Sequence, residues 1–208
     1  MVLNNFVVFE GIDGAGTSTQ IEILKNSILK DKIDFSAEPT SEETGVFLRK
    51  VLSSKIVLEP KTIAYLFAAD RAEHVYGKKG IINSINNNKC VVIDRYIFSS
   101  LAYQSVSCSK EFVYSLNKDF PLPQILFFFD ITPDKSLERI KNRDTREIYE
   151  NLDYLEKTRN QYLSVIEEYK NNSEAKDMQI IIIDATKPID EISNIILNSI
   201  QNLPIFKM

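Results

Sequence analysis

Cysteine and histidine are scarce in this sequence, whose 208 residues include two cysteines, Cys90 and Cys108, and one histidine, His74. Two cysteines are too few for a disulfide framework, which favours a reducing compartment, so we expect a cytoplasmic protein. We expect His74 at a surface position of a helix, with a structural role. A single histidine also argues against a catalytic triad or a zinc site built around it.

Basic residues and long apolar runs are also in short supply. The chain has 25 lysines and arginines against 29 aspartates and glutamates, a net charge of −4. This balance argues against a broad basic face that binds nucleic acid, although a local basic pocket for a small charged ligand remains compatible with it. The longest apolar runs, Ile125–Phe129 and Ile180–Ile183, have the length of strands rather than of membrane spans. Met1–Phe9 lacks the pattern of a signal peptide, so we expect a soluble protein that binds neither membranes nor nucleic acid.

Short apolar runs alternate along the chain with longer segments of helical length. The runs are typical of parallel strands covered on both faces; they are Phe6–Glu10, Ile33–Ala37, Cys90–Asp94, Ile125–Ile131 and Gln179–Asp184. The predicted helices are Ser18–Lys30, Lys61–Asn86, Pro133–Lys141, Leu152–Lys170 and Ile189–Gln201. This alternation predicts a single α/β domain over residues 1–208, a five-stranded parallel sheet flanked by helices on both faces. Ligands of such sheets bind at the carboxyl ends of the strands, where Glu10, Asp94 and Asp130 lie.

The segment from Gly11 to Thr19, GIDGAGTST, follows a predicted strand and begins a predicted helix. It matches seven of the eight positions of the phosphate-loop pattern G-x-x-x-x-G-K-[ST], and Thr17 stands where the pattern has lysine. We expect the backbone N–H groups to hold a phosphate group, and Ser18 stands where proteins with this pattern have the hydroxyl that coordinates Mg²⁺. The residues of this phosphate site are Gly11, Gly14, Ala15, Gly16, Thr17, Ser18 and Thr19. A glycine-rich turn that binds no ligand is the alternative.

Thr17 is expected to affect the rate of phosphoryl transfer more than nucleotide binding. Backbone amides still hold the β-phosphate, but the cation on the β- and γ-phosphate oxygens is missing. By analogy with the loss of one oxyanion-hole donor, the rate falls by a factor on the order of 10²–10³ unless another cation takes its place.

Phe67 and Arg71 lie four residues apart on a predicted helix and therefore share a face. One side chain offers an aromatic plane on which a base can stack, and the other offers a fork of hydrogen-bond donors. Ser100 and Gln104 repeat this spacing on the next predicted helix, and a glutamine amide can both accept from an imide N–H and donate to a carbonyl. The alternatives are core packing for Phe67 and a solvated helix face for Ser100 and Gln104.

The sequence resembles thymidylate kinases, in the nucleoside-monophosphate kinase group of P-loop proteins, nearly from end to end. The segments that carry the resemblance are Phe9–Gly14, Glu38–Pro39, Leu66–Arg71, Asp94–Tyr96 and Ser99–Gln104. The small Ala15, together with Arg143 and Arg146, makes it similar to the bacterial type. The resemblance implies a P-loop kinase fold, transfer of the γ-phosphoryl group of ATP to dTMP in dTTP synthesis, Mg²⁺ as cofactor, and a homodimer.

The resemblance also implies roles for individual residues in the dTMP site. Phe67 stacks on thymine, Arg71 donates to its O4 atom, and Ser100 and Gln104 complete the set that contacts the base. Cytosine presents the opposite pattern of donors and acceptors, which would leave Arg71 unpaired.

Other implied roles concern the sugar and the phosphates. Arg95 clamps the acceptor phosphate with Arg49 as a second contact, and Asp94 orients Arg95 and a metal-bound water. A plain ion pair between Asp94 and Arg95 is the alternative. The remaining assignments are Asp13 to the sugar 3′-hydroxyl, Tyr103 to the space beside the 2′ position, and Glu38 to the vicinity of the acceptor phosphate and metal.

Arg139, Lys141, Arg143 and Arg146 form a basic cluster, which the resemblance implies is a lid around residues 139–151 that closes over ATP. In this role Arg143 and Arg146 are catalytic, together with Arg95 and Asp94. A solvated helix end is the alternative.

Two other functions stay open at the level of sequence. One is the same fold acting on another nucleotide or deoxynucleoside, and the other is a non-catalytic nucleotide-binding protein whose phosphate loop has lost its cation. The apolar segments around Ile63–Phe67 and Leu101 form either a dimer interface or part of the core.

Overall fold

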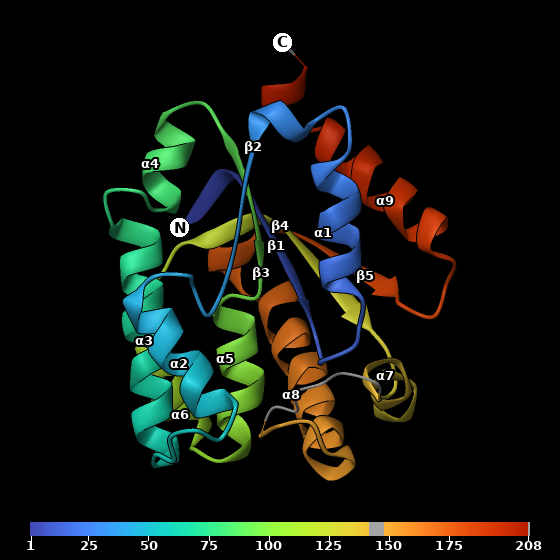
Figure 1. The fold of residues 1–208 in the computed structure, drawn as a ribbon. Helices are drawn as coiled ribbons and strands as arrows, with labels where there is room; N and C mark the ends of the chain where they lie inside the picture. Colours follow the sequence, from blue (N-terminus) through green and yellow to red (C-terminus); the bar gives the residue numbers. More distant parts are fainter. Residues whose placement is uncertain (142–147, 208) are drawn as a thin grey trace.

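The computed structural model describes residues 1–141 and 148–207. Within these residues, five strands form one parallel sheet in the order β2-β3-β1-β4-β5 (Figure 1). The strands are β1 Val2–Gly11, β2 Ile33–Ala37, β3 Cys90–Asp94, β4 Leu122–Asp130 and β5 Gln179–Asp184. The predicted α/β architecture with a five-stranded parallel sheet is confirmed.

Helices connect the strands and cover both faces of the sheet. They are α1 Thr17–Lys25, α2 Glu43–Leu52, α3 Pro60–Tyr76, α4 Ile81–Asn86, α5 Ile97–Tyr103, α6 Lys110–Asn117, α7 Pro133–Ile140, α8 Leu152–Lys170 and α9 Ile189–Gln201. Helices α1 and α9 pack together on one side, and α5 packs against α8 on the other (Figure 1). This is the arrangement that right-handed crossovers produce when the chain first moves to one edge of the sheet and then back across it. None of the described helices has the length and apolar character that a membrane span requires.

Several predicted helix boundaries are wrong. The helix expected over Lys61–Asn86 is two helices, because α3 ends at Tyr76 and a short link from Gly77 to Gly80 precedes α4. Glycine has a low helix propensity, and the two glycines end the first helix and lead into the second. Helix α1 ends at Lys25 rather than Lys30. Helices α2 and α6 were not predicted.

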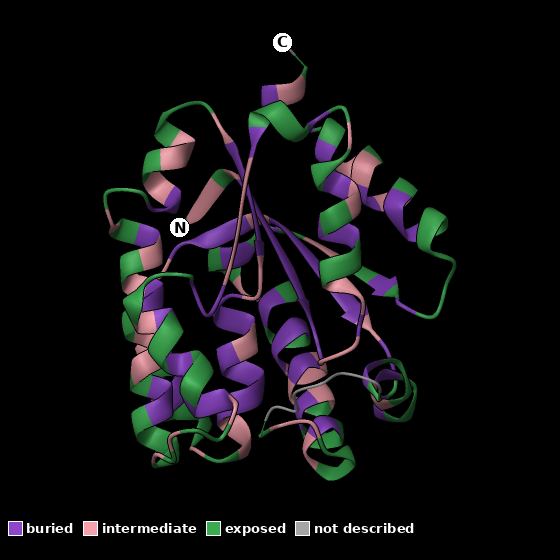
Figure 2. Ribbon diagram, viewed as in Figure 1, coloured by how far each residue is buried: buried purple, intermediate pink, exposed green. Residues whose placement is uncertain are grey.

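The central strands lie in the core of the molecule. Phe6, Phe9 and Phe127 are fully buried, and the rings of Phe9 and Phe127 meet edge to face at 5.3 Å. Figure 2 shows that burial is concentrated on these strands and on the inward faces of the helices. Burial on both faces explains why the strand sequences are almost continuously apolar.

The register of the sheet brings three strand ends to one edge. Asp94 pairs with Phe9 of β1 on one side and with Ala37 of β2 on the other. The backbone N–H of Arg95 donates to the Phe9 carbonyl at 2.8 Å, and that of Glu38 donates to the Asp94 carbonyl at 2.9 Å. The segments that follow β1, β2 and β3 therefore leave the sheet side by side.

Candidate functional site

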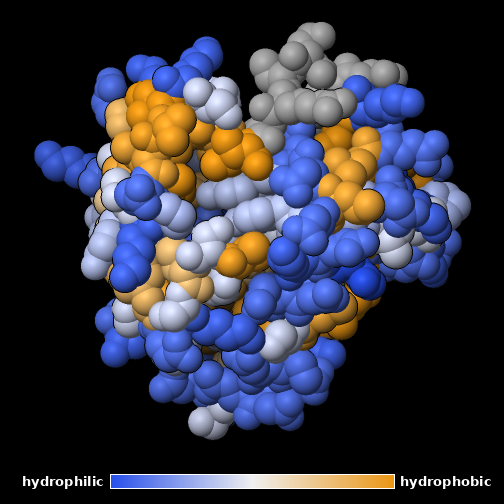
Figure 3. All heavy atoms as spheres, turned by 90° about the horizontal axis from the view of Figure 1, so that it is seen from below, coloured by the Kyte–Doolittle hydropathy of each residue, from blue (hydrophilic) through white to orange (hydrophobic). Residues whose placement is uncertain are grey.

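A cavity of about 570 Å³ lies at the carboxyl edge of the sheet. Figure 3 shows the molecule from the side at which the strands end, where hydrophilic and hydrophobic surface alternate. The predicted site residues that line this cavity are Asp13, Gly14, Ala15, Gly16, Thr17, Ser18, Thr19, Glu38, Arg49, Phe67, Arg71, Asp94, Arg95, Tyr103 and Gln104. Residues expected to contact two different nucleotides thus share one cavity.

The loop between β1 and α1 has the conformation that a phosphate-binding loop requires. Gly14 and Gly16 have φ angles of 83° and 100°, in the region that favours glycine. A side chain at Gly14 would also collide with the backbone of Ser136, because its Cβ would lie 2.5 Å from that carbonyl oxygen. Thr17 is the first residue of α1, so the backbone N–H groups at the start of that helix face the cavity edge.

Ser18 and Asp94 join the start of α1 to the end of β3. The Ser18 hydroxyl donates to Oδ2 of Asp94 at 3.1 Å. Oδ1 of Asp94 is buried and has no hydrogen-bond partner among the described residues. Burial raises the pKa of this carboxyl, and the positive charge of Arg95 and hydrogen bonds from Thr17 and Ser18 oppose that shift. A carboxylate oxygen and a hydroxyl suit a hard divalent cation that takes its other ligands from phosphates and water.

Arg95 has a left-handed backbone conformation, with φ of 70°. Its Nη2 donates to Asp13 Oδ1 at 2.8 Å and its Nη1 to Ser99 Oγ at 3.2 Å. Among the described residues the ion pair of Arg95 is with Asp13 of the phosphate loop, while the charges of Arg95 and Asp94 interact without a hydrogen bond between them. Asp13 also accepts a hydrogen bond from the Tyr103 hydroxyl, at 2.9 Å from its Oδ2.

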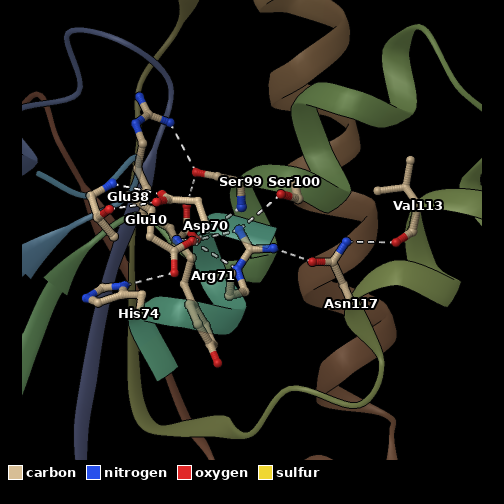
Figure 4. Close-up of polar contacts among 12 residues, drawn as sticks. Glu10, Glu38, Asp70, Arg71, His74, Ser99, Ser100, Val113 and Asn117 are labelled. Carbon is tan, nitrogen blue, oxygen red and sulfur yellow. Dashed lines mark hydrogen bonds and ion pairs between the residues drawn. The ribbon is translucent and has the colours of Figure 1, made fainter. Parts of the chain in front are cut away.

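Phe67 and Arg71 both line the cavity from α3, as their spacing predicted. Arg71 is 1% exposed, and its contacts with Glu38, Ser100 and Asn117 are drawn in Figure 4. Gln104, in the short 3₁₀ turn after α5, lines the same cavity. Its Oε1 is buried without a hydrogen-bond partner among the described residues.

Glu38 binds two side chains of α3. Its Oε2 accepts from Nε of Arg71 at 2.9 Å, and its Oε1 contacts Nδ1 of His74 at 3.0 Å. Nε2 of His74 in turn contacts Ser36 Oγ at 2.8 Å. The expectation of a surface position for His74 is wrong, because only 9% of its side chain is exposed.

Asp70 was not predicted from the sequence, and it organises the turn that follows Glu38. This buried carboxylate accepts from the Thr40 backbone N–H at 2.8 Å, and from the hydroxyls of Thr40 and Thr44 at 2.6 Å each. Arg49 lines the cavity nearby, where its Nη2 donates to the Pro39 carbonyl. A threonine-rich turn after a strand is the only hint that the sequence offers for this arrangement.

Two predicted residues are absent from the described lining, and two others lie outside the described residues. Gly11 ends β1 beneath the loop, and Ser100 accepts from Nη2 of Arg71 at 3.1 Å. Ser100 therefore contacts the residue that faces the cavity. Arg143 and Arg146 fall in the segment 142–147, which the structure does not describe.

Arg139 lines the cavity. The sequence had indicated this residue only as a member of the basic cluster. Its Nη1 donates to the carbonyls of Gly14 and Ala15 at 3.4 and 3.3 Å, and its Nη2 to the Ala185 carbonyl at 2.7 Å. This side chain connects the phosphate loop to the segment after β5.

Glu10 is a buried carboxyl beneath the site. The sequence singled it out because it lies at the end of an apolar strand. Its two oxygens accept from the backbone of Tyr96 at 2.8 Å and from the hydroxyls of Ser99 and Tyr162 at 2.6 and 2.8 Å. Burial raises its pKa from 4.5 to about 7, against the opposing effect of these hydrogen bonds. Ser99 is also a partner of Arg95, so Glu10 is one contact removed from the cavity.

Comparison with known proteins identifies the family. The family model described as thymidylate kinase matches residues 9–196. The chain is 40% identical over 167 residues to the thymidylate kinase of Leptospira interrogans (serovar Lai), covering 77% of this chain and 81% of the relative. Relatives from Treponema pallidum and Methanocaldococcus jannaschii that carry thymidylate kinase names are 41% and 38% identical. Their matches cover 96% and 98% of this chain, and 96% and 100% of the relatives. The chain belongs to the thymidylate kinase family.

Proposed function

We propose that this protein is a cytoplasmic thymidylate kinase that transfers the γ-phosphoryl group of ATP to dTMP, giving dTDP and ADP. The observation that carries the proposal is the single cavity lined both by the phosphate loop and by Phe67, Arg71 and Gln104. Membership of the thymidylate kinase family supports the same reaction. The scarcity of cysteine supports the location.

On the donor side, the residues from Gly14 to Thr19 bind the phosphates of ATP through backbone N–H groups at the start of α1. Asp94 and Ser18 hold Mg²⁺, for which the buried unpartnered Oδ1 and the adjacent hydroxyl are suitable oxygen ligands. When bound, Mg²⁺ neutralises negative charge on the phosphates and orients them.

On the acceptor side, Phe67 stacks on thymine, and Arg71 donates to O4. The Oε1 of Gln104, which is buried and unpartnered among the described residues, accepts from the imide N–H of the base. The base thereby satisfies a polar atom that would otherwise stay unpaired.

The phosphate of dTMP attacks the γ-phosphorus of ATP in line with the bond that breaks. A new oxygen–phosphorus bond forms to give dTDP as the bond to the β,γ-bridging oxygen breaks, which leaves ADP, and no covalent enzyme intermediate is needed. Arg95 clamps the acceptor phosphate, with Arg49 as a second contact. Asp13 and Tyr103, which contact each other beside Arg95, bind the sugar.

The lid around residues 139–151 provides the positive charge that Thr17 lacks. In this proposal Arg143 and Arg146 approach the transferred group when both nucleotides are bound. The position of Arg139 supports this role of the lid, since its guanidinium contacts the phosphate loop.

We also propose that the protein is a homodimer whose interface includes α2, α3 and α6. Support comes from exposed apolar side chains on these helices, Phe47, Tyr65 and Tyr114 at 37%, 56% and 44% exposure. Ile63 and Leu101 are buried in the protomer and belong to its core.

The proposed reaction is tested by measuring ADP formation from ATP and Mg²⁺ with dTMP, dUMP, dCMP or thymidine as acceptor. We expect ADP to form with dTMP at the highest kcat/KM. Nucleotide binding without ADP formation would instead support the non-catalytic protein, and a preference for dCMP or thymidine would support a different kinase.

A further inference from the structure

We infer that Asn117, the last residue of α6, is a positioning residue that sets how strongly the site prefers thymine to cytosine. It does so by holding Nη1 of Arg71. The inference rests on the proposed function, because it concerns recognition of the acceptor base. Asn117 is not among the described residues that line the cavity, so it acts through Arg71 rather than by touching the nucleotide.

The contacts of Arg71 leave one nitrogen with a donor to spare. Its Nε and Nη2 lie 2.9 and 2.7 Å from Oε2 of Glu38, and Nη2 also donates to Ser100 Oγ at 3.1 Å. Its Nη1 donates to Oδ1 of Asn117, which is its single acceptor among the described residues. Because Nη1 carries two N–H groups, one of them remains for a ligand in the cavity that Arg71 lines.

Asn117 is itself held in one orientation. It is 3% exposed, and its Nδ2 donates to the carbonyl of Val113, one turn earlier in α6, at 2.7 Å (Figure 4). A reversed amide would direct N–H groups at Nη1 of Arg71 and an oxygen at the Val113 carbonyl. Both contacts would then be repulsive, so Asn117 presents an acceptor to Arg71 in a defined direction.

Two aromatic rings and the polar contacts restrict Arg71 in different ways. The guanidinium carbon lies 5.3 Å from the centre of the Tyr96 ring and 5.7 Å from that of Phe120. Such contacts favour the position of the cation but depend only weakly on rotation within the guanidinium plane. The in-plane direction is therefore set by the acceptors, with Glu38 at Nε and Nη2 and Asn117 at Nη1.

This direction matters because thymine and cytosine differ at the atom that Arg71 meets. Thymine presents a carbonyl oxygen at position 4, whereas cytosine presents an amino group that cannot accept from Nη1. A buried donor that faces an amino group stays unpaired, which is the costly outcome that gives hydrogen-bonding sites their selectivity. Without Asn117, Nη1 is no longer held toward position 4 of the base, so its hydrogen bond to the thymine oxygen weakens. Cytosine makes no such bond and loses little, so the preference for thymine falls.

The test compares Asn117→Leu, which removes the acceptor with little change in shape, and Asn117→Asp, which keeps an acceptor oxygen. The control is Asn171→Leu at the end of α8. Asn171 makes the same bond to a carbonyl four residues earlier, at 2.9 Å from Glu167, and is exposed. For each protein, kcat and KM are measured for dTMP, dUMP and dCMP at saturating ATP and Mg²⁺.

We expect the ratio of kcat/KM for dTMP to that for dCMP to fall about 10- to 100-fold in Asn117→Leu, the range of one hydrogen bond to a charged group. The effect arises mainly in the KM for dTMP, and dUMP follows dTMP because it shares the carbonyl. Asn171→Leu keeps the wild-type ratio. Asn117→Asp keeps more of it than Asn117→Leu does, because its carboxylate still accepts from Nη1 although it loses the donor to the Val113 carbonyl.

An equal loss with all three nucleotides in Asn117→Leu would mean a purely structural role and would overturn the inference, as would an unchanged ratio. If Asn117→Leu does not fold, Asn117→Ser, whose hydroxyl is too short to reach Nη1, is judged by the same ratio. A wild-type protein that does not phosphorylate dTMP would overturn the proposed function. A wild-type protein that prefers dTMP to dCMP, with variants that keep the same preference, would overturn this inference alone.

Discussion

The protonation of Glu10 couples pH to the stability of the fold. Its pKa rises from 4.5 to about 7 on folding, so the folded state favours the protonated form. The stabilisation that this provides is complete below pH 4.5 and is lost as the pH rises through 7. The contribution of Glu10 therefore makes the folded protein more stable in weak acid than at pH 8.

We predict that Glu10→Gln removes this dependence. The glutamine amide reproduces the protonated carboxyl, because its oxygen accepts from the backbone of Tyr96 and its N–H₂ donates to the hydroxyls of Ser99 and Tyr162. Relative to wild type, the free energy of unfolding of the variant should rise by up to roughly 3 kcal/mol between pH 4.5 and pH 8. Urea unfolding at both pH values measures this, with the exposed Glu156→Gln on α8 as control. A difference that stays constant with pH would show that Glu10 titrates normally.

Thr17 permits a second prediction at the scale of one residue. Thr17→Lys should raise kcat, by up to a factor on the order of 10²–10³, because a fixed cation returns to the β- and γ-phosphate oxygens. The KM for dTMP should stay the same, since Thr17 belongs to the proposed ATP side of the cavity. Thr17→Met, which has a long side chain without charge, separates the effect of charge from that of volume. Equal gains in both variants would contradict an electrostatic origin.

The basic segment between α7 and α8 carries the prediction at the scale of an element. If Arg143 supplies charge to the transferred phosphoryl group as proposed, Arg143→Ala should lower kcat by a factor on the order of 10²–10³ and change dTMP binding little. Lys141→Ala is the control within the same basic cluster. Steady-state kinetics with calorimetric dTMP binding separates the two effects, and an unchanged kcat in Arg143→Ala would refute the assignment.

Local pattern was sufficient for some elements and insufficient for others. The bounds of β2, β3, β5, α8 and α9 agree with the predicted ranges. For β3, β5, α8 and α9 the reason is a sustained apolar pattern between polar or turn residues, whereas β2 alternates apolar and polar residues. Helix α2 was missed because its first turn contains Gly45, which packs against the backbone of Thr40, a contact that sequence spacing does not reveal.

At the scale of the whole molecule, we predict that the proposed homodimer depends on the exposed surface of α3. Tyr65 is 56% exposed and packs edge to face on Phe112 of the same protomer at 5.3 Å. Tyr65→Glu should convert the dimer to a monomer, because a buried charge in an interface has no partner. Sedimentation velocity over a range of concentrations measures this. Ile28→Glu, at an 86% exposed site after α1, should leave the dimer intact, and a dimeric Tyr65→Glu would place the interface elsewhere.

The amino-acid sequence by itself determined the α/β class, the phosphate loop, and the residues expected at the base and phosphates, because these depend on local spacing and residue chemistry. The tertiary structure decided the partnerships. Arg95 turns to Asp13 instead of Asp94, His74 is enclosed beside Glu38, and Asn117 reaches Arg71 from a helix 46 residues away in the chain. Such contacts join elements that only the sheet order and the packing of helices bring together, and no periodicity within one segment encodes them.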